Sequence, residues 1–461
     1  MNKGKKMLKR VLCLFMAVSM LSGFQGCAML LQYAQEYSAD SKSSTTDREE
    51  EKEDRTPSQT AEQEQQGTAA EQQTATEEVP VANDSVVKDV LEDEAFLNKL
   101  ELIGELVDQC YLNGVSKEDV QEAMFRGLLA GLGDPYSGYY TEEEYKELME
   151  SSNGIYCGIG ATVQQNMETM LITIIKPFVN GPAYKAGMLP GDIVYMVDGL
   201  DITGMDINNV VAMMKGEAGT EVEVTVMRNG EQVTLTITRD FVEVETITHE
   251  MLDNKIGLIT ITEFDEVTIQ QFKDAVDGLK ADGMKGLVID LRDNPGGLLN
   301  AVVDMLEYIL PDGLIVYTED KYGEREEYYG KDNNELKLPI AVLVNGNSAS
   351  ASEIFAAAMQ DYEAATIVGT TSFGKGIVQS IYPVNWVASQ LRMKGFEEDG
   401  SAVKVTISYY YTPSGRCIHG TGVTPDVEVE LAEELKQQVV IEKEEDNQLA
   451  AAIEVLMKKI K

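Results

Sequence analysis

The stretch "LPIAVLVNGNSASASEIFAAAMQD", residues 338–361, joins a short apolar run to a turn of small residues and then to a segment with helical apolar periodicity. The run 340–344 has the composition of a buried strand, and Ser348, Ser350 and Ser352 stand where the helix begins. Free N–H groups and the positive end of the helix dipole meet at such a junction, which suits a nucleophile and the oxyanion of acyl transfer. Serines also cap helices well, so this stretch alone leaves capping and catalysis both open.

The same alternation of strand and helix extends to both sides of this stretch. From about residue 256, "KIGLITITEF" precedes "TIQQFKDAVDGLKADG", and "GLVIDLRDNPGG" precedes "LLNAVVDMLEYILP". "ATIVGTTSFGKGIVQ" then follows the serine-containing helix. This rhythm predicts an α/β domain with covered, buried strands. We place that domain at residues 243–430 and a C-terminal helical tail at 431–461.

Two further ordered segments precede this domain. "FLNKLELIGELVDQCYL" and "SKEDVQEAMFRGLLAGL" carry apolar residues at helical spacing, with Ser116 as an N-cap, and another helix is predicted from Thr141. These features predict an N-terminal helical segment over residues 85–152. Residues 153–242 alternate β-rich runs with Gly and Pro, and Asn229-Gly230 closes a predicted hairpin. That pattern predicts a compact barrel of strands with one or two short helices.

The first 27 residues have the pattern of an export signal. A basic start, "MNKGKKMLKR", is followed by the apolar run "VLCLFMAVSMLSG", which has the length of a signal-peptide core and is short for a membrane span. "FQGC" then ends at Cys27 and resembles the lipobox of bacterial lipoproteins; ordinary cleavage nearby or an uncleaved anchor are the alternatives. Residues 28–84 are rich in Glu, Gln, Thr and Ser and predict a disordered acidic linker. We therefore expect export and anchoring to the outer face of a bacterial cell membrane.

Charge and cysteine content exclude other classes. The formal net charge of −40 argues against a nucleic-acid-binding protein, which needs a basic face. Beyond the first 27 residues only Cys110, Cys157 and Cys417 remain, an odd number without metal-ligand spacing. We expect buried free thiols and no disulfide framework, and neither a metal nor a cofactor is predicted.

A serine nucleophile needs a base, and the chain holds only two histidines, His249 and His419. Neither lies near the serines in the sequence, and nothing local supports a Ser–His pair through His419. Lys375, in "SFGKGIVQ", is the candidate base, because desolvation can keep its amine neutral and the flanking glycines let the backbone approach closely. The alternative is an ordinary lysine on a surface loop.

A third motif is "VIDLRDNPGGLL". A strand ends at Leu291, and the turn 294–297 presents N–H groups without side-chain cover, as half of an oxyanion hole or a phosphate cradle would. The phosphate alternative is weak, because neither a P-loop nor a G-x-G-x-x-G fingerprint occurs in the chain.

Together these motifs resemble those of the C-terminal processing (tail-specific) peptidases, a serine–lysine peptidase family with an embedded PDZ domain. The resemblance rests on the order of "GPAYKAGMLPGDIVYMVDG", "DLRDNPGG", "SASASEIFAAAMQD", "GTTSFGKGIVQ" and "YYTPSGRCIHGTGVTPDVEV", and it covers nearly the whole ordered chain. It implies a multidomain α/β fold: a helical N-terminal segment, a PDZ-like β-barrel at residues 153–242, and an α/β peptidase domain of the crotonase/ClpP-like kind.

The resemblance also implies the roles of individual residues. The nucleophile would be Ser350, the middle serine of the triplet, with Lys375 as its base and Gln379 hydrogen-bonded to orient the lysine. The oxyanion hole would be formed by the backbone N–H groups of Gly296 and Ala351.

In the barrel, "YCGIG" resembles the carboxylate-binding loop of PDZ domains, so Gly158, Ile159 and Gly160 would bind the C-terminal carboxylate of a peptide. A simple β-turn is the alternative. The expected function is an exported serine endopeptidase acting on polypeptides with free C-termini. Its rivals are a catalytically silent PDZ scaffold and a crotonase-like acyl-CoA enzyme. A homo-oligomer or a regulatory partner is left open.

Overall fold

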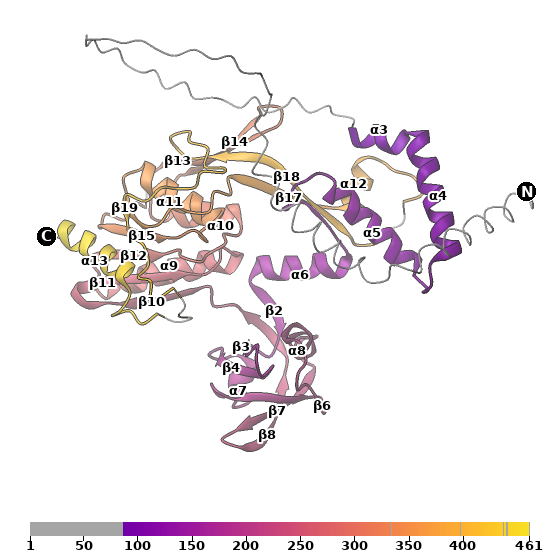
Figure 1. The fold of residues 1–461 in the computed structure, drawn as a ribbon. Coiled ribbons are helices and arrows are strands. Elements are labelled where there is room, and N and C mark those ends of the chain that lie inside the picture. Colours follow the sequence, from indigo (N-terminus) through magenta and orange to yellow (C-terminus); the bar gives the residue numbers. More distant parts are fainter. Residues whose placement is uncertain (1–85, 333, 397, 437, 439–440, 461) are drawn as a thin grey trace, which may run out of the picture. The chain divides into compact units, whose positions relative to one another are not determined.

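The computed structural model describes residues 86–460 apart from 333, 397, 437 and 439–440 (Figure 1). The predicted signal segment, Cys27 and the predicted linker lie outside the described residues. The chain divides into Met1–Glu78 and Val79–Lys461, and all of the described residues belong to the second unit. Of the helices in this described part, none is long and apolar enough to cross a membrane.

A six-stranded sheet forms the centre of the predicted α/β domain, and its middle strands run parallel as expected. At one edge of the sheet, the strand of residues Ile247–Met251 runs antiparallel to its neighbour, Ile256–Ile261. Every residue of the two central strands is buried, which explains their unbroken apolar sequences. In spatial order the strands are β10 (Ile247–Met251), β11 (Ile256–Ile261), β12 (Gly286–Asp290), β15 (Ile340–Val344), β16 (Ala365–Gly369) and β19 (Val427–Glu428).

Helices cover both faces of this sheet. On one face, α9 (Glu266–Ala281), α10 (Leu299–Glu307) and α11 (Ala351–Asp361) contribute to a single apolar core with alternate residues of the strands. On the other face, α13 (Asn447–Lys459) packs Leu449 and other apolar side chains against the remaining strand residues. The predicted C-terminal tail therefore holds one helix that belongs to the core of this domain.

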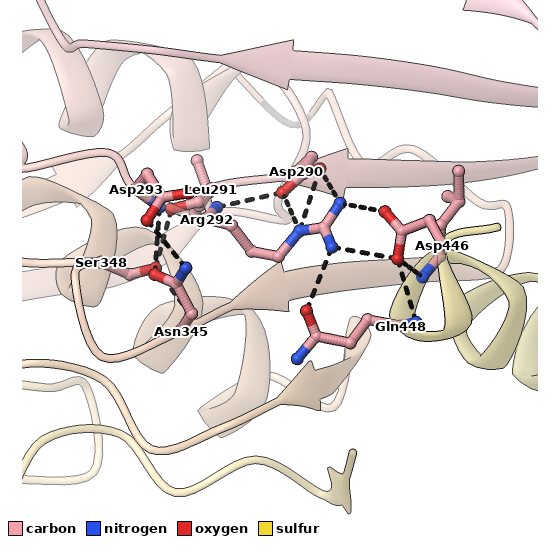
Figure 2. Close-up of polar contacts among 9 residues, drawn as sticks. Asp290, Leu291, Arg292, Asp293, Asn345, Ser348, Asp446 and Gln448 are labelled. Carbon is pink, nitrogen blue, oxygen red and sulfur yellow. Dashed lines mark hydrogen bonds and ion pairs between the residues drawn. The ribbon is translucent and has the colours of Figure 1, made fainter. Parts of the chain in front are cut away.

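An ion network joins α13 to the end of β12 (Figure 2). The Arg292 guanidinium donates to Asp290 at 2.6 Å and to Asp446 at 2.7 Å, and it also donates to the Gln448 side-chain oxygen at 3.1 Å. Burial disfavours this charge, but the hydrogen bonds and charges of the two aspartates raise the pKa of Arg292 above its usual value. Asp446 also accepts from the first N–H groups of α13, so one carboxylate both caps the helix and pairs with the arginine.

A second sheet was not predicted. It consists of β1 (Gly138–Tyr140), β18 (Ala402–Tyr411), β13 (Gly313–Asp320) and β14 (Arg325–Gly330), with β17 (Ile377–Pro383) also paired to β18. Because β1 comes from the N-terminal segment, that segment takes part in the peptidase half of the molecule through main-chain hydrogen bonds. The short helix α12 (Val384–Gln390) connects β17 to β18.

The N-terminal segment forms the three predicted helices, α4 (Glu94–Cys110), α5 (Lys117–Ala130) and α6 (Glu142–Asn153), and a further short helix, α3 (Val86–Glu92), precedes them. The predicted starts of α5 and α6 are confirmed, because the side chains of Ser116 and Thr141 accept N–H groups of the following turn. None of these helices buries a residue. Large apolar side chains on α4 and α5 are therefore exposed, among them Phe96, Leu102, Ile103, Leu106 and Phe125.

The predicted barrel is present between α6 and β10. It contains β3 (Ala161–Gln165), β4 (Ile172–Pro177), β5 (Ile193–Val197), β7 (Glu221–Arg228) and β8 (Glu231–Thr238), with β6 (Leu200–Asp201) paired to β5, and the helices α7 (Pro182–Lys185) and α8 (Ile207–Met214). Asn229 and Gly230 close the β7–β8 hairpin with φ angles of 52° and 85°, as predicted for that pair. The chain enters and leaves the barrel through β2 (Ile155–Gly158) and β9 (Asp240–Glu243), which pair with each other.

The cysteine prediction was partly wrong. Cys110, Cys157 and Cys417 are free, as expected, but Cys110 and Cys417 are exposed rather than buried.

Candidate active site

The structure separates the three serines of the opening stretch. Ser348 and Ser352 are fully buried, and their hydroxyls donate to the backbone carbonyls of Leu291 at 2.7 Å and Asn294 at 3.0 Å. Ser350 instead lines a pocket of about 290 Å³, and its hydroxyl donates no hydrogen bond to another described residue. The two outer serines therefore brace the turn, while the middle one faces a cavity.

Ser350 has an unusual backbone. Its φ of 54° and ψ of −113° place a non-glycine residue in a conformation that costs free energy and that occurs preferentially at functional sites. The Ser350 N–H donates to Glu353, and the Tyr410 hydroxyl donates to its carbonyl at 3.1 Å. These bonds hold the strained residue at the start of α11.

Glu353 joins the serine to the loop that carries the predicted base. Its carboxylate is fully buried and accepts four hydrogen bonds, from the backbone N–H groups of Ser350, Gly374 and Lys375 and from the Ser372 hydroxyl, at 2.5–2.9 Å. The sequence analysis missed this residue. The spacing Ser-x-x-Glu, which is typical of helix starts, was the signal that could have found it.

Lys375 lines the same pocket as Ser350. The glycines beside it are needed for packing. A Cβ at Gly376 would lie 2.5 Å from the backbone nitrogen of His419, and a Cβ at Gly374 would lie 3.1 Å from the backbone nitrogen of Gly422. Burial lowers the pKa of the Lys375 amine and the charge of Lys404 lowers it further, whereas Asp134 and Glu353 act in the opposite direction. The direction of the shift is the one that a lysine base requires.

A turn of the N-terminal segment reaches this lysine. The Lys375 ammonium lies 4.4 Å from the centroid of the Tyr136 ring, close enough for a cation–π contact. Within the described part of the chain, no hydrogen bond joins the Lys375 ammonium to Ser350. The sequence analysis gave no role to this turn, "GDPYSG", which carries none of the usual catalytic motifs.

Gln379 lines the pocket, but its predicted hydrogen bond to Lys375 is not formed in this structure. Its amide donates to the Thr406 hydroxyl at 3.1 Å, and that hydroxyl donates to Asp134 at 2.7 Å. Ser137 donates to the same carboxylate at 2.5 Å. Gln379 therefore belongs to a network that fixes the N-terminal turn on β18.

The two predicted oxyanion donors lie close together, but they differ in availability. A Cβ at Gly296 would lie 2.9 Å from the Ala351 nitrogen. Among the described residues no acceptor is bonded to the Ala351 N–H, which points out of the N-terminus of α11. The Gly296 N–H, by contrast, donates to the Asn294 side-chain oxygen at 2.8 Å. The Ala351 N–H is thus available to donate to an oxyanion, whereas the Gly296 N–H would have to share or release its hydrogen bond to Asn294.

The histidines are both exposed, and neither lines the pocket of Ser350. His249 lies on β10, and His419 packs edge-on against Tyr409. Across residues 86–460, with the gaps stated above, no cluster of three or more His, Cys, Asp or Glu side chains has the arrangement of a metal site.

The predicted carboxylate-binding loop of the barrel presents free donors. The carbonyls of Ile159 and Gly160 accept N–H groups of Ala183 and Phe178, but within the described part of the chain their own N–H groups have no acceptor. The Lys215 backbone, directly after α8, lies close to Gly158, and the Lys215 ammonium lies 5.4 Å from the centroid of the Tyr156 ring, just before the loop. Backbone N–H groups without an acceptor are donors that a carboxylate can use.

Comparisons with known proteins agree with this geometry. Residues 255–429 match the model of peptidase family S41, and residues 179–228 match that of the PDZ domain. The carboxy-terminal processing protease CtpA of Bacillus subtilis is 35% identical over 341 residues, which cover 74% of this chain and 70% of that protein. The chain belongs to peptidase family S41.

Two further proteins are similar to this chain. A protein of Staphylococcus aureus described as "Probable CtpA-like serine protease" is 36% identical over 342 residues, covering 73% of this S41 chain. The matched region spans 66% of the length of the Staphylococcus aureus protein. A solved structure titled photosystem II D1 C-terminal processing protease has 28% identity and a TM-score of 0.42, and the match covers 74% of this chain and 88% of that one.

The contact between Tyr136 and Lys375 generates a test. A ring face stabilises the ammonium form, so replacing Tyr136 with Leu should lower the pKa of Lys375 further. The lysine ¹³Cε chemical shift, followed by NMR across a pH titration, measures this directly. Tyr136→Phe keeps the ring and should leave the titration unchanged. An equal shift in both variants would mean that the ring face does not act on the lysine.

Proposed function

We propose that this chain is an exported serine endopeptidase that engages polypeptide C-termini through its PDZ domain and cleaves with a Ser350–Lys375 dyad. The observation that carries the proposal is that Ser348, Ser350 and Ser352 have different surroundings. The two outer hydroxyls are tied to backbone carbonyls, while Ser350 shares one pocket with a half-buried lysine of lowered pKa. Family membership supports the reaction class.

The proposed reaction passes through an acyl-enzyme. Lys375, as the neutral amine, takes the Ser350 hydroxyl proton while the oxygen attacks the scissile carbonyl carbon, and the lysine then gives that proton to the departing amine. Water, deprotonated by the same lysine, hydrolyses the ester and restores the serine. The developing oxyanion lies at the N-terminus of α11, where the Ala351 N–H is available and Gly296 is close by.

For this reaction the lysine side chain has to turn from the Tyr136 ring toward the serine. We propose that the contact of Lys375 with the Tyr136 ring is a resting arrangement of this lysine. Gln379 is placed to receive the lysine once it moves, since both line the same pocket.

The rival functions fit less well. A catalytically silent PDZ scaffold would not need a strained serine, a half-buried lysine and a fully hydrogen-bonded carboxylate between them. A crotonase-like acyl-CoA enzyme would share the paired N–H groups, but the barrel with its carboxylate-binding loop has no part in that reaction.

Recognition of C-termini is proposed for the Gly158–Ile159–Gly160 loop, because its free N–H groups and Lys215 favour an anionic peptide end. A second copy of the chain or a regulatory partner is also proposed, supported by the exposed apolar side chains of α4 and α5. Light scattering would report such an assembly. Lipidation at Cys27 and anchoring to the outer face of the membrane rest on the sequence alone.

Substitution of the dyad tests the mechanism. Ser350→Ala and Lys375→Ala should each lower kcat for cleavage of an unstructured peptide by about a thousandfold or more, because the two residues act as a unit. Ser348→Ala and Ser352→Ala are matched controls: each loses a bracing hydrogen bond worth about 1 kcal/mol of stability, yet should keep substantial activity. Full activity in Lys375→Ala would contradict the dyad.

Amidation of the substrate tests the PDZ loop. Removing the terminal charge should weaken engagement roughly ten- to hundredfold at limiting peptide concentration, because charge-assisted hydrogen bonds are lost. Gly160→Ala should reduce this preference, because Gly160 has a φ of 74° and an added Cβ would meet Val242 at 3.2 Å. Gly230→Ala has similar backbone strain at a hairpin tip, with no atom near its Cβ, and should keep the preference. Equal cleavage of acid and amide peptides by the unmodified protein would argue against recognition by this loop.

Processing at the N-terminus tests the anchor. If Cys27 carries lipid, the protein should enter the detergent phase with membranes, and Cys27→Ser should release it or alter its processing. Mass spectrometry of the mature N-terminus gives the decisive measurement, since an unlipidated start at another residue is incompatible with this anchor.

A further inference from the structure

A second lysine lies in the pocket of Ser350. Lys404, on β18, pairs across the sheet with Ile381 of β17 on one side and with Gly138 of β1 on the other. Ile381, Lys404 and the neighbouring Gln379 all line the pocket. The strand pairing therefore presents the Lys404 side chain to the same cavity as the serine and the predicted base.

Lys404 has no acidic partner in the part of the chain that the structure describes. Its ammonium lies 5.3 Å from the centroid of the Tyr140 ring, and among the described residues no carboxylate forms an ion pair with it. A lysine in a cavity without an acidic partner retains the capacity to bind an anion through charge-assisted hydrogen bonds.

Lysines outnumber acidic side chains among the described residues that line the pocket, and with Lys375 acting as the neutral base it is Lys404 that supplies the positive charge. Lys375 and Lys404 both line the pocket, and Asp265 is the one acidic residue that does so among the described residues. Burial, and after it the charge of Glu263, raises the pKa of Asp265 to about 7, so this carboxyl is only partly ionised near neutral pH. The rest of the wall is largely apolar, with Leu298, Leu299 and Ile354 facing the cavity. A ligand with an apolar body and one negative charge fits this lining.

We propose that the Lys404 ammonium binds a carboxylate of the polypeptide lying in the catalytic pocket, and that Lys404 is thereby a specificity-determining residue separate from the PDZ loop. The carboxylate is either the α-carboxylate at the end of the chain or the side chain of an acidic residue beside the scissile bond. This inference rests on the proposed peptidase function, because it assigns a role to Lys404 in selecting the substrate of that reaction.

Lys404 also acts on the base, and the test has to separate the two effects. Its charge lowers the pKa of Lys375, against the opposing charges of Asp134 and Glu353. Removing it should raise that pKa and slow the cleavage of every peptide alike at a given pH. Selection of a carboxylate, in contrast, changes the ratio between an anionic peptide and its neutral twin.

The experiment compares such twins. In the first series, the two peptides of a pair have the same sequence and differ only in a free or an amidated C-terminus. In the second series, the two peptides of a pair differ only in Glu or Gln at one position near the cleaved bond. For each twin pair, kcat/KM is measured with the unmodified protein, Lys404→Met, Lys404→Arg and Lys394→Met. Lys394 is exposed and lies outside the pocket, so its variant controls for the loss of a lysine charge. Thermal unfolding of each variant verifies the fold.

We expect the unmodified protein to prefer one anionic twin by roughly ten- to hundredfold, which is the loss expected for a charge-assisted bond. The pocket and the PDZ loop can both contribute to that preference. Lys404→Met should lose most of the pocket's contribution, whereas Lys404→Arg and Lys394→Met should keep it. Loss in the terminal series assigns the α-carboxylate, and loss in the Glu/Gln series assigns an acidic side chain. The PDZ loop contributes equally to all four proteins, so its effect cancels in the comparison between variants.

An anionic preference of the same size in Lys404→Met and in the unmodified protein would overturn the inference, as would the absence of any preference. Failure of the proposed function is a different outcome, in which none of the proteins cleaves a peptide. The same twins are therefore also bound to the Ser350→Ala protein with and without Lys404→Met, by fluorescence anisotropy. A preference that disappears with Lys404 supports the carboxylate site without any turnover, and an unchanged preference contradicts it.

Discussion

The buried carboxylate of Glu353 is the constraint on which the site depends. A carboxylate removed from water is costly unless hydrogen bonds compensate it, and here four donors do so. Three of those donors belong to Ser350, Gly374 and Lys375, so satisfying the charge brings the turn of Ser350 and the loop of Lys375 together. The relative positions of serine and lysine thus follow from satisfying one buried charge, and their own side chains need not touch for the site to be held in place.

The N-terminal segment is part of this arrangement. Asp134 connects to Gln379 through the Thr406 hydroxyl, and Tyr136 supports the lysine side chain. The edge of the second sheet is completed by β1 from the same segment. The N-terminal segment, which the sequence presents as a separate set of helices, therefore contributes residues to the surroundings of Lys375.

Local features of the fold could be predicted from the sequence, and long-range ones could not. The strand 340–344, the helix after Ser350 and the hairpin at Asn229-Gly230 follow from apolar period and turn chemistry over a few residues. The prediction of Ser350 and Lys375 came from motifs of a known family, and the structure shows that Ser348 and Ser352 are buried and hydrogen-bonded whereas Ser350 lines a pocket. The contact of Tyr136 with Lys375 joins residues far apart in the chain, and no periodicity reports such a pair. The hydrogen bond of Gln379 to Thr406 depends on the register in which β17 pairs with β18, and that register cannot be derived from the sequence of either strand.

The paired strands β2 and β9 give the barrel its particular place in the chain. They are the two crossings between the barrel and the rest of the protein, and they lie side by side, with the Val244 N–H bonded to the Gly154 carbonyl just outside the pair. Because the two ends of the barrel lie side by side, the barrel interrupts the rest of the chain at a single point. The strands of the α/β sheet can therefore pair in the same way whatever domain is inserted there. Recombination at that point can therefore exchange one PDZ domain for another without altering the strand pairing of the peptidase domain.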